Sequence, residues 1–188
     1  MNKVAVAILL IFLLQGQGDQ KVQKAVDLAR KVSDNLVDSV KATLFKELGK
    51  GGYLNAISAC SNLAQDIIKA HQSKYGIYVR RVSEKYRNEL DKPDDYELAI
   101  LKRLDELNRE GNLPQEYYEV VNDKDGRYLR YFKPLIVQPM CLNCHGTDDF
   151  LSKEIKNFLK EKYPEDKATG YKAGDFRGAV SVKIKLDE

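Results

Sequence analysis

Residues 141–146 read Cys141-Leu142-Asn143-Cys144-His145-Gly146. Two cysteines separated by two residues, with a histidine directly after the second, match the spacing by which haem is attached covalently in c-type cytochromes. In one tight turn both sulfurs fall on the same side, where each can bond a vinyl carbon of the porphyrin, and His145 points its imidazole at the iron. Gly146 lets the backbone pass close to the ring. This stretch predicts one covalently bound haem c, around which the rest of the chain is arranged.

Two other uses of a CxxC pair compete with haem. A zinc site usually needs a second pair of ligands at similar spacing, and the chain offers only Cys60 and His71 elsewhere. A redox dithiol needs a thioredoxin-like βαβ context, which the sequence downstream does not show. The histidine placed directly after the second cysteine favours haem over both.

Length and charge restrict the class of protein. The chain has 188 residues, which suffice for one domain with a real core and are few for two. Its formal net charge is +3, and acidic and basic residues are mixed throughout. Because no basic block or stripe stands out, nucleic acid is not an expected partner.

The N-terminal segment has the pattern of a secretory signal. A single positive side chain, Lys3, precedes an apolar run from Val4 to Leu14 that is short for a permanent membrane span. We therefore expect a signal peptide over residues 1–18, a domain over residues 19–188, and a periplasmic or otherwise extracytoplasmic location. The expected Ala-x-Ala cleavage site is absent, so an uncleaved anchor that associates with the membrane is the alternative.

Apolar residues at steps of three and four predict two helices at the start of the domain. The first runs from about Asp19 to Leu48, and the glycine-rich stretch 49–52 ends it. Its length also suits a coiled-coil dimer, but packing of the apolar face on its own domain is favoured. The second helix runs from about Tyr53 to Gln72 and places Cys60 in the middle of its apolar face.

A haem iron bound by His145 leaves its opposite face for a second ligand, commonly methionine or histidine. Met1 belongs to the N-terminal segment and Met140 adjoins the attachment motif. The remaining candidates are Cys60, His71, a lysine or an open position. Cys60 has apolar neighbours, whereas His71 sits at the polar end of the helix. Their eleven-residue separation is roughly 16 Å along a helix, so only one of them can reach the iron.

The rest of the chain predicts a sheet with two further helices. Strands are expected over 75–83, 117–122, 127–133 and 135–137, with a hairpin turn at 123–126. A helix capped by Asp94 or Asp95 continues to Leu107, and a shorter one covers 152–162. The last strand, 177–186, alternates: Val180, Val182, Ile184 and Leu186 form one face, and Ser181, Lys183 and Lys185 form the other, which we expect to be solvated.

Three arginines are candidates to pair with the two haem propionates: Arg80, Arg81 and Arg87. A guanidinium group matches a carboxylate with two parallel hydrogen bonds. For any single one of them, a solvated surface arginine is the alternative reading.

The order of a helix pair, a mixed sheet, CxxCH and a closing strand resembles the PAS-like c-type haem domain family. The matching pieces cover nearly all of the domain: Ala59-Cys60, Arg81-Val82-Ser83, Arg87-Asn88, Pro93, Cys141 to Gly146, Gly170-Tyr171, Gly174-Asp175 and Arg177-Gly178. The resemblance implies iron held by His145 and Cys60. It also implies an α+β fold in which an N-terminal helical hairpin packs on a PAS-like antiparallel sheet.

The residues support two main functions. One is an exported haem module whose redox state or small-ligand occupancy is read by a redox or signalling partner protein. The other is a low-potential electron-transfer cytochrome. Peroxidase-like catalysis would need an open coordination position and a distal acid–base group, so we do not expect an enzyme.

Overall fold

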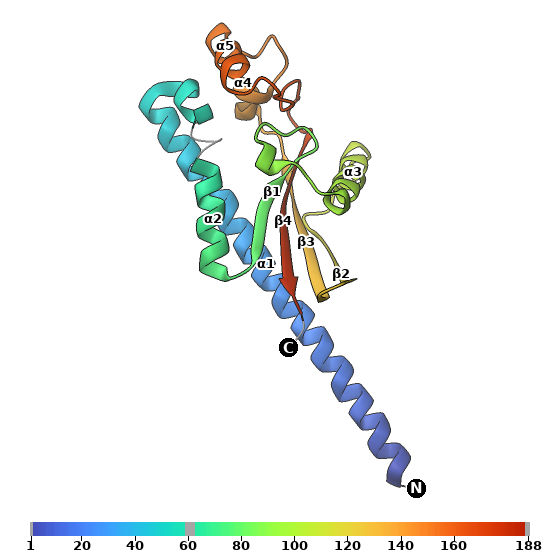
Figure 1. Cartoon of the computed structure of the whole chain (residues 1–188). Helices are drawn as coiled ribbons and strands as arrows, with labels where there is room; N and C mark the ends of the chain where they lie inside the picture. Colours follow the sequence, from blue (N-terminus) through green and yellow to red (C-terminus); the bar gives the residue numbers. More distant parts are fainter. Residues whose placement is uncertain (1, 59–62, 187–188) are drawn as a thin grey trace.

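The computed structural model describes residues 2–58 and 63–186, with side chains from residue 19 onward. Helix α1 (Asn2–Ser58) runs the length of the molecule, and its N-terminal part extends beyond the sheet (Figure 1). Gly51 and Gly52 have non-helical backbone angles, so the expected glycine stop is a kink inside α1.

The helix is continuous across residues 18 and 19, and the boundary between signal and domain stays a prediction. In the part of the chain that the structure describes, no helix is long and apolar enough to cross a membrane.

Helix α2 (Ala64–Tyr75) packs back against α1 to form the N-terminal hairpin (Figure 1). It ends at Gly76, which has φ 64° and closes the helix by donating its N–H to Gln72 O. The strand expected from Tyr75 does not begin there, because Tyr75 is the last residue of α2. The next strand, β1 (Tyr78–Val82), begins only after this glycine.

Four antiparallel strands form one sheet in the order β1-β4-β3-β2. β2 (Tyr117–Asp123) and β3 (Gly126–Ile136) form the expected hairpin. The run expected as a separate strand at 135–137 is instead the end of β3, which continues to Ile136. β4 (Phe176–Lys185) lies between β1 and β3. Together with the helices this confirms the predicted α+β class.

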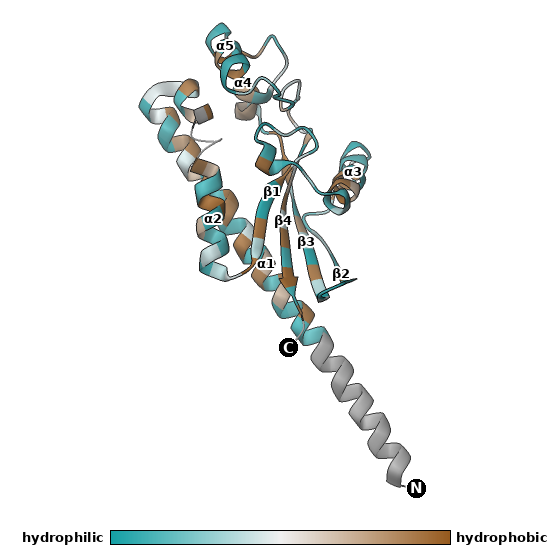
Figure 2. Cartoon of the chain, viewed as in Figure 1, coloured by the Kyte–Doolittle hydropathy of each residue, from teal (hydrophilic) through white to brown (hydrophobic). Residues whose placement is uncertain are grey.

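Both faces of the sheet are covered. On one face, α1 and α2 bury a core with residues of β1, β3 and β4, and Figure 2 shows apolar residues on α1 and α2 beside the sheet. On the other face, α3 (Asp95–Arg109) packs Ile100, Leu101 and Leu104 against Phe132 and Ala179. The expectation of a solvated face on the last strand is therefore wrong for Ser181, which is fully buried between Arg80 and Phe132 of the neighbouring strands.

A buried carboxylate joins α3 to the sheet. Asp94 caps α3 by accepting a hydrogen bond from Glu97 N, and Glu97 accepts one from Asp94 N in return. Glu97 is fully buried and also binds the guanidinium group of Arg80, while Arg130 Nη2 lies 3.9 Å from its other oxygen. One carboxylate thus compensates two cations under α3.

The substitution Glu97→Ala should lower the free energy of unfolding by about 3–5 kcal/mol, because it leaves Arg80 and Arg130 without their shared buried counter-charge. Urea unfolding followed by circular dichroism measures this loss. Glu106→Ala, an exposed change on the same helix, is the control and should stay within about 0.5 kcal/mol of the wild type. Similar losses in the two variants would contradict the assignment.

Candidate functional site

The CxxCH motif forms one helical turn at the end of β3. Residues 139–141 form a short 3-10 turn, η3 (Pro139–Cys141), which leads into α4 (Leu142–His145). At offsets of three and four residues, Cys141, Cys144 and His145 share one side of the turn. The two cysteines are thiols and are not joined in a disulfide. Cys141 packs against the apolar cluster of Val137, Leu142 and Tyr171. Cys144 packs against a second cluster, which Ile57 at the end of α1 forms with Ile155 and Leu159 of α5 (Lys153–Lys162).

Gly146 closes this turn, but for a different reason from the one expected. A Cβ atom at this position would lie 2.5 Å from Leu142 O and 2.8 Å from Phe150 Cβ. The space is therefore filled by the protein's own turn and is not kept for a ring. Gly146 N donates to Leu142 O at 2.8 Å, and Gly146 O accepts from Gly170 N. The glycine allows the motif to pack tightly on the segment that follows α5.

The imidazole of His145 is fixed by the backbone. Its Nδ1 lies 2.6 Å from Ala168 O, and Tyr171 contacts the ring edge-on at a centroid distance of 6.4 Å. Burial lowers the pKa of His145 well below its usual value, and the positive charges of Arg177 and Arg87 add to this effect. The ring is neutral at pH 7, and because Nδ1 must donate to a carbonyl oxygen, Nε2 carries the lone pair.

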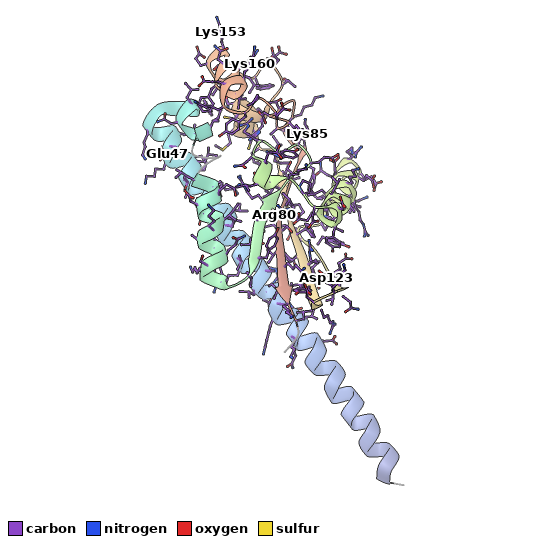
Figure 3. The ribbon with its side chains drawn as sticks, viewed as in Figure 1. Glu47, Arg80, Lys85, Asp123, Lys153 and Lys160 are labelled. Carbon is purple, nitrogen blue, oxygen red and sulfur yellow. The ribbon has the colours of Figure 1, made fainter. Side chains whose placement is uncertain are left out.

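A pocket of about 160 Å³ adjoins His145 and Cys141. Its other walls come from the end of β1, the η2 turn (Glu89–Asp91), the end of β3 and the start of β4. Three guanidinium groups line it, from Arg81, Arg87 and Arg177. Figure 3 shows the labelled Lys85 just beyond the end of β1 and Arg80 on the strand itself.

Two of the three guanidinium groups are matched by carboxylates. Arg81 Nη2 lies 3.1 Å from Asp91 Oδ2. Arg87 Nη2 lies 3.0 Å from Asp166 Oδ2 and also donates to Cys144 O at 2.7 Å. Both ion pairs are largely removed from solvent. They hold the η2 turn and the CxxCH turn against the end of β1.

The third guanidinium group, of Arg177, has no carboxylate within ion-pair distance in the described part of the chain. Its Nη1 donates to Ser83 Oγ at 2.6 Å and to Lys85 O at 3.0 Å. Burial lowers the pKa of Arg177, and repulsion by Arg81 and Arg87 acts in the same direction. Arg81 Nε is also buried, with no hydrogen-bond partner among the described residues. The pocket thus has a surplus of positive charge and an unused donor, which suit an incoming carboxylate.

Comparison with known proteins gives one family and one solved structure. The model of the Tll0287-like family matches residues 14–185. The chain belongs to the Tll0287-like family. A solved structure, described as the crystal structure of the cyanobacterial heme-protein Tll0287, is 26% identical and superposes with a TM-score of 0.62, covering 86% of this chain and 96% of that one. No curated protein sequence gives a significant match.

In this member of the Tll0287-like family, four of the residues selected from the sequence meet at one pocket: Cys141, His145, Arg81 and Arg87. Cys144 belongs to the same turn and packs against the apolar cluster of Ile57, Ile155 and Leu159. Cys60 lies outside the described residues. Two other candidates are placed elsewhere: Arg80 binds Glu97 under α3, and His71 lies in α2 with its Nδ1 2.9 Å from Ile67 O.

Sequence reasoning missed Arg177 and Asp91 as pocket residues. Arg177 precedes Gly178, which has φ 140°, and a Cβ atom at Gly178 would lie 2.2 Å from Val82 O. This close approach of β4 to the end of β1 places Arg177 beside Ser83. The Arg-Gly pair at the start of an apolar strand was the available signal, since a glycine there indicates that another backbone approaches closely.

Proposed function

We propose that this protein is an exported mono-haem c-type protein that acts as a redox or small-ligand sensing module, with iron held by His145 and Cys60. The observation that carries the proposal is the CxxCH turn, which presents a neutral imidazole beside a pocket with surplus guanidinium charge. The similarity to a protein described as a heme-protein supports it. The same residues also suit the alternative, a low-potential electron carrier.

The residues at the site fit a haem group in three respects. A neutral imidazole whose Nδ1–H donates to a backbone carbonyl is the usual form of a metal-binding histidine, with Nε2 as the ligand atom. Arg177 and the unpartnered Nε of Arg81 offer donors for the two propionates. The pocket, at about 160 Å³, is smaller than the roughly 300–1,000 Å³ of typical ligand sites, so we assign it to the propionate end of the group rather than to the whole ring.

Covalent attachment needs only the two thiols. Each sulfur would bond one carbon of a vinyl group while the thiol hydrogen goes to the other carbon, so the addition requires no oxidant. The redox-dithiol alternative finds less support, because all strand pairings of the described sheet are antiparallel, unlike a thioredoxin-like βαβ unit.

Chain connectivity supports Cys60 as the second iron ligand. Ile57, three residues before it, belongs to the apolar cluster against which Cys144 of the motif packs. Gln65, five residues after it, donates to Asp91 Oδ1 at 2.9 Å, and Asp91 lines the pocket. Described residues on both sides of Cys60 in the sequence are therefore connected to the site, and this supports the proposal. His71 is a further six residues along α2, or roughly 9 Å along its axis, and is turned to its own helix.

A thiolate ligand favours sensing over simple electron transfer. A thiolate donates charge to ferric iron and stabilises it. A haem with cysteine and histidine ligands would therefore have a low reduction potential. On reduction or protonation the thiol of Cys60 can leave, which frees a position for a diatomic gas. Electron transfer alone would use ligation that does not change with oxidation state.

Export completes the proposal, because c-type haem is attached outside the cytoplasm in bacteria. Lys3 and the apolar run that follows it supply a signal-like N-terminal segment. We propose a periplasmic or otherwise extracytoplasmic location, with the uncleaved segment as a membrane anchor as the alternative. A redox or signalling protein would be the partner that responds to the state of the haem.

Covalent attachment predicts that the mass of the denatured protein exceeds that of the polypeptide by one haem, and that its colour stays with the protein in acidic acetone. The double variant Cys141→Ala/Cys144→Ala should lose both properties, because no sulfur remains to form a thioether. Met140→Leu, next to the motif, is the control and should keep both. Colourless wild-type protein, or pigment that is extracted by acid, would contradict the proposal.

Ligation by Cys60 predicts a low-spin thiolate signal in the electron paramagnetic resonance spectrum of the ferric protein. Cys60→Ala should abolish that signal, because the substitution removes the sulfur donor. His71→Ala tests the competing ligand and should leave the spectrum unchanged. If the signal survives Cys60→Ala and disappears with His71→Ala, the ligand assignment is wrong.

Gas binding distinguishes the two candidate functions. In the sensing module, carbon monoxide or nitric oxide added to the reduced protein should shift the Soret band, because Cys60 no longer occupies the iron. Reduced Cys60→Ala should show the same shift with either gas, and its ferric form should also bind nitric oxide, because no cysteine has to leave. A Soret band that neither gas changes would favour the electron carrier.

A further inference from the structure

A continuous set of hydrogen bonds surrounds His145. Its Nδ1 lies 2.6 Å from Ala168 O, and Ala168 N donates to Asp166 Oδ1 at 2.9 Å. Asp166 Oδ2 accepts from Arg87 Nε at 3.1 Å, and Arg87 Nη2 donates to Cys144 O at 2.7 Å. The set of hydrogen bonds therefore starts at His145 and returns to Cys144, the residue that precedes His145 in the motif.

Both charged members of this set are buried. The side chains of Arg87 and Asp166 are only 9% and 8% exposed, so their ion pair is shielded from solvent and its geometry is well defined. Each makes a second contact with the backbone, Arg87 with Cys144 O and Asp166 with Ala168 N. The pair therefore fixes the distance between the CxxCH turn and the carbonyl that orients His145.

The segment that carries this carbonyl has no regular secondary structure. It lies between α5, which ends at Lys162, and β4, which begins at Phe176. Backbone contacts tie it to the motif after the carbonyl: Gly170 N donates to Gly146 O at 2.8 Å and Tyr171 N to His145 O at 3.0 Å. Before the carbonyl, Lys167 N donates to Tyr86 O at 3.1 Å. The Arg87–Asp166 ion pair is the buried ionic link in this arrangement.

We propose that Arg87 and Asp166 are positioning residues that hold Ala168 O against His145 Nδ1, and thereby set the orientation and donor strength of the imidazole toward the iron. This inference rests on the proposed function for its consequence at the haem, and on the described contacts for the placement of His145. In this assignment Arg87 serves the histidine, and the propionates are left to Arg177 and Arg81.

The chain contains only two histidines, which makes the placement directly measurable. In protein labelled with ¹⁵N-histidine and kept reduced, the Nδ1–H of His145 should exchange slowly with solvent. Asp166→Ala should speed this exchange by about tenfold or more, because the carbonyl is no longer held in place. His71, whose Nδ1 contacts Ile67 O in α2, is the internal control and should not change.

Further variants separate positioning from general loss of structure. Asp166→Asn keeps an acceptor for Ala168 N and removes only the charge, so it should speed the exchange of His145 Nδ1–H by less than Asp166→Ala does. It is also the test variant if Asp166→Ala does not fold. Arg87→Gln should behave like Asp166→Asn, and Arg87→Lys should restore part of the protection. Asp148→Ala, which removes an exposed ion pair with Lys156, should match the wild type.

A second readout reports on the haem. In Asp166→Ala the reduction potential should rise, because an imidazole that loses its carbonyl partner donates less charge to ferric iron. Unchanged His145 exchange in a folded Asp166 variant overturns the inference, even if haem is covalently bound. Faster exchange in a chain that carries no haem supports the placement of His145 and instead overturns the proposed function.

Discussion

Burying a guanidinium ion away from water costs several kcal/mol unless a counter-charge compensates it. At the end of β1 this protein places three such groups around one pocket and supplies two carboxylates, Asp91 and Asp166. The shape of the site depends on this imbalance. Each carboxylate fixes a backbone segment as well as a charge, and Arg177 remains beside Ser83 with donors available to a carboxylate from outside the chain.

The sheet order makes this concentration of charge possible. Because β4 is inserted between β1 and β3, its first residues arrive beside the last residues of β1. Gly178 permits the close approach, since any Cβ atom there would overlap Val82 O. β3 leads from the same end of the sheet into the CxxCH turn. Arg81, Arg177 and the motif therefore meet although they lie far apart in the sequence.

Local signals in the sequence predicted much of this fold. The glycine-rich stretch at 49–52 marked the kink in α1, Asp94 marked the start of α3, and residues 123–126 marked the hairpin turn. Each of these depends on a few neighbouring residues, so the sequence alone contains the information. Gly76 carried an equally local helix-stop signal that the strand-like residues after it concealed.

What the sequence did not predict depends on contacts between distant segments. Alternation in the last strand indicated a solvated face, but Ser181 is buried because α3 covers that part of the sheet. Arg87, a candidate partner of the propionates, lines the pocket, but its carboxylate partner in the chain is Asp166, 79 residues away. Arg177 was expected to begin a strand and to belong to a family-matching Arg-Gly pair, but not to line the pocket. No spacing rule connects such residues, because their proximity follows from strand order and not from local periodicity.

The helical hairpin is attached to the site at its tip and to the sheet along its length. Ile57 belongs to the apolar cluster against which Cys144 packs, and Gln65 binds Asp91, which also pairs with Arg81. Cys60 lies between Ile57 and Gln65 in the sequence, so under the proposed function release of its thiol from iron would act on the hairpin. Helix α1 continues far beyond the sheet on the other side of the kink at Gly51 and Gly52 (Figure 1). An electron carrier needs no such connection, which is why the attachment of the hairpin favours a sensing module.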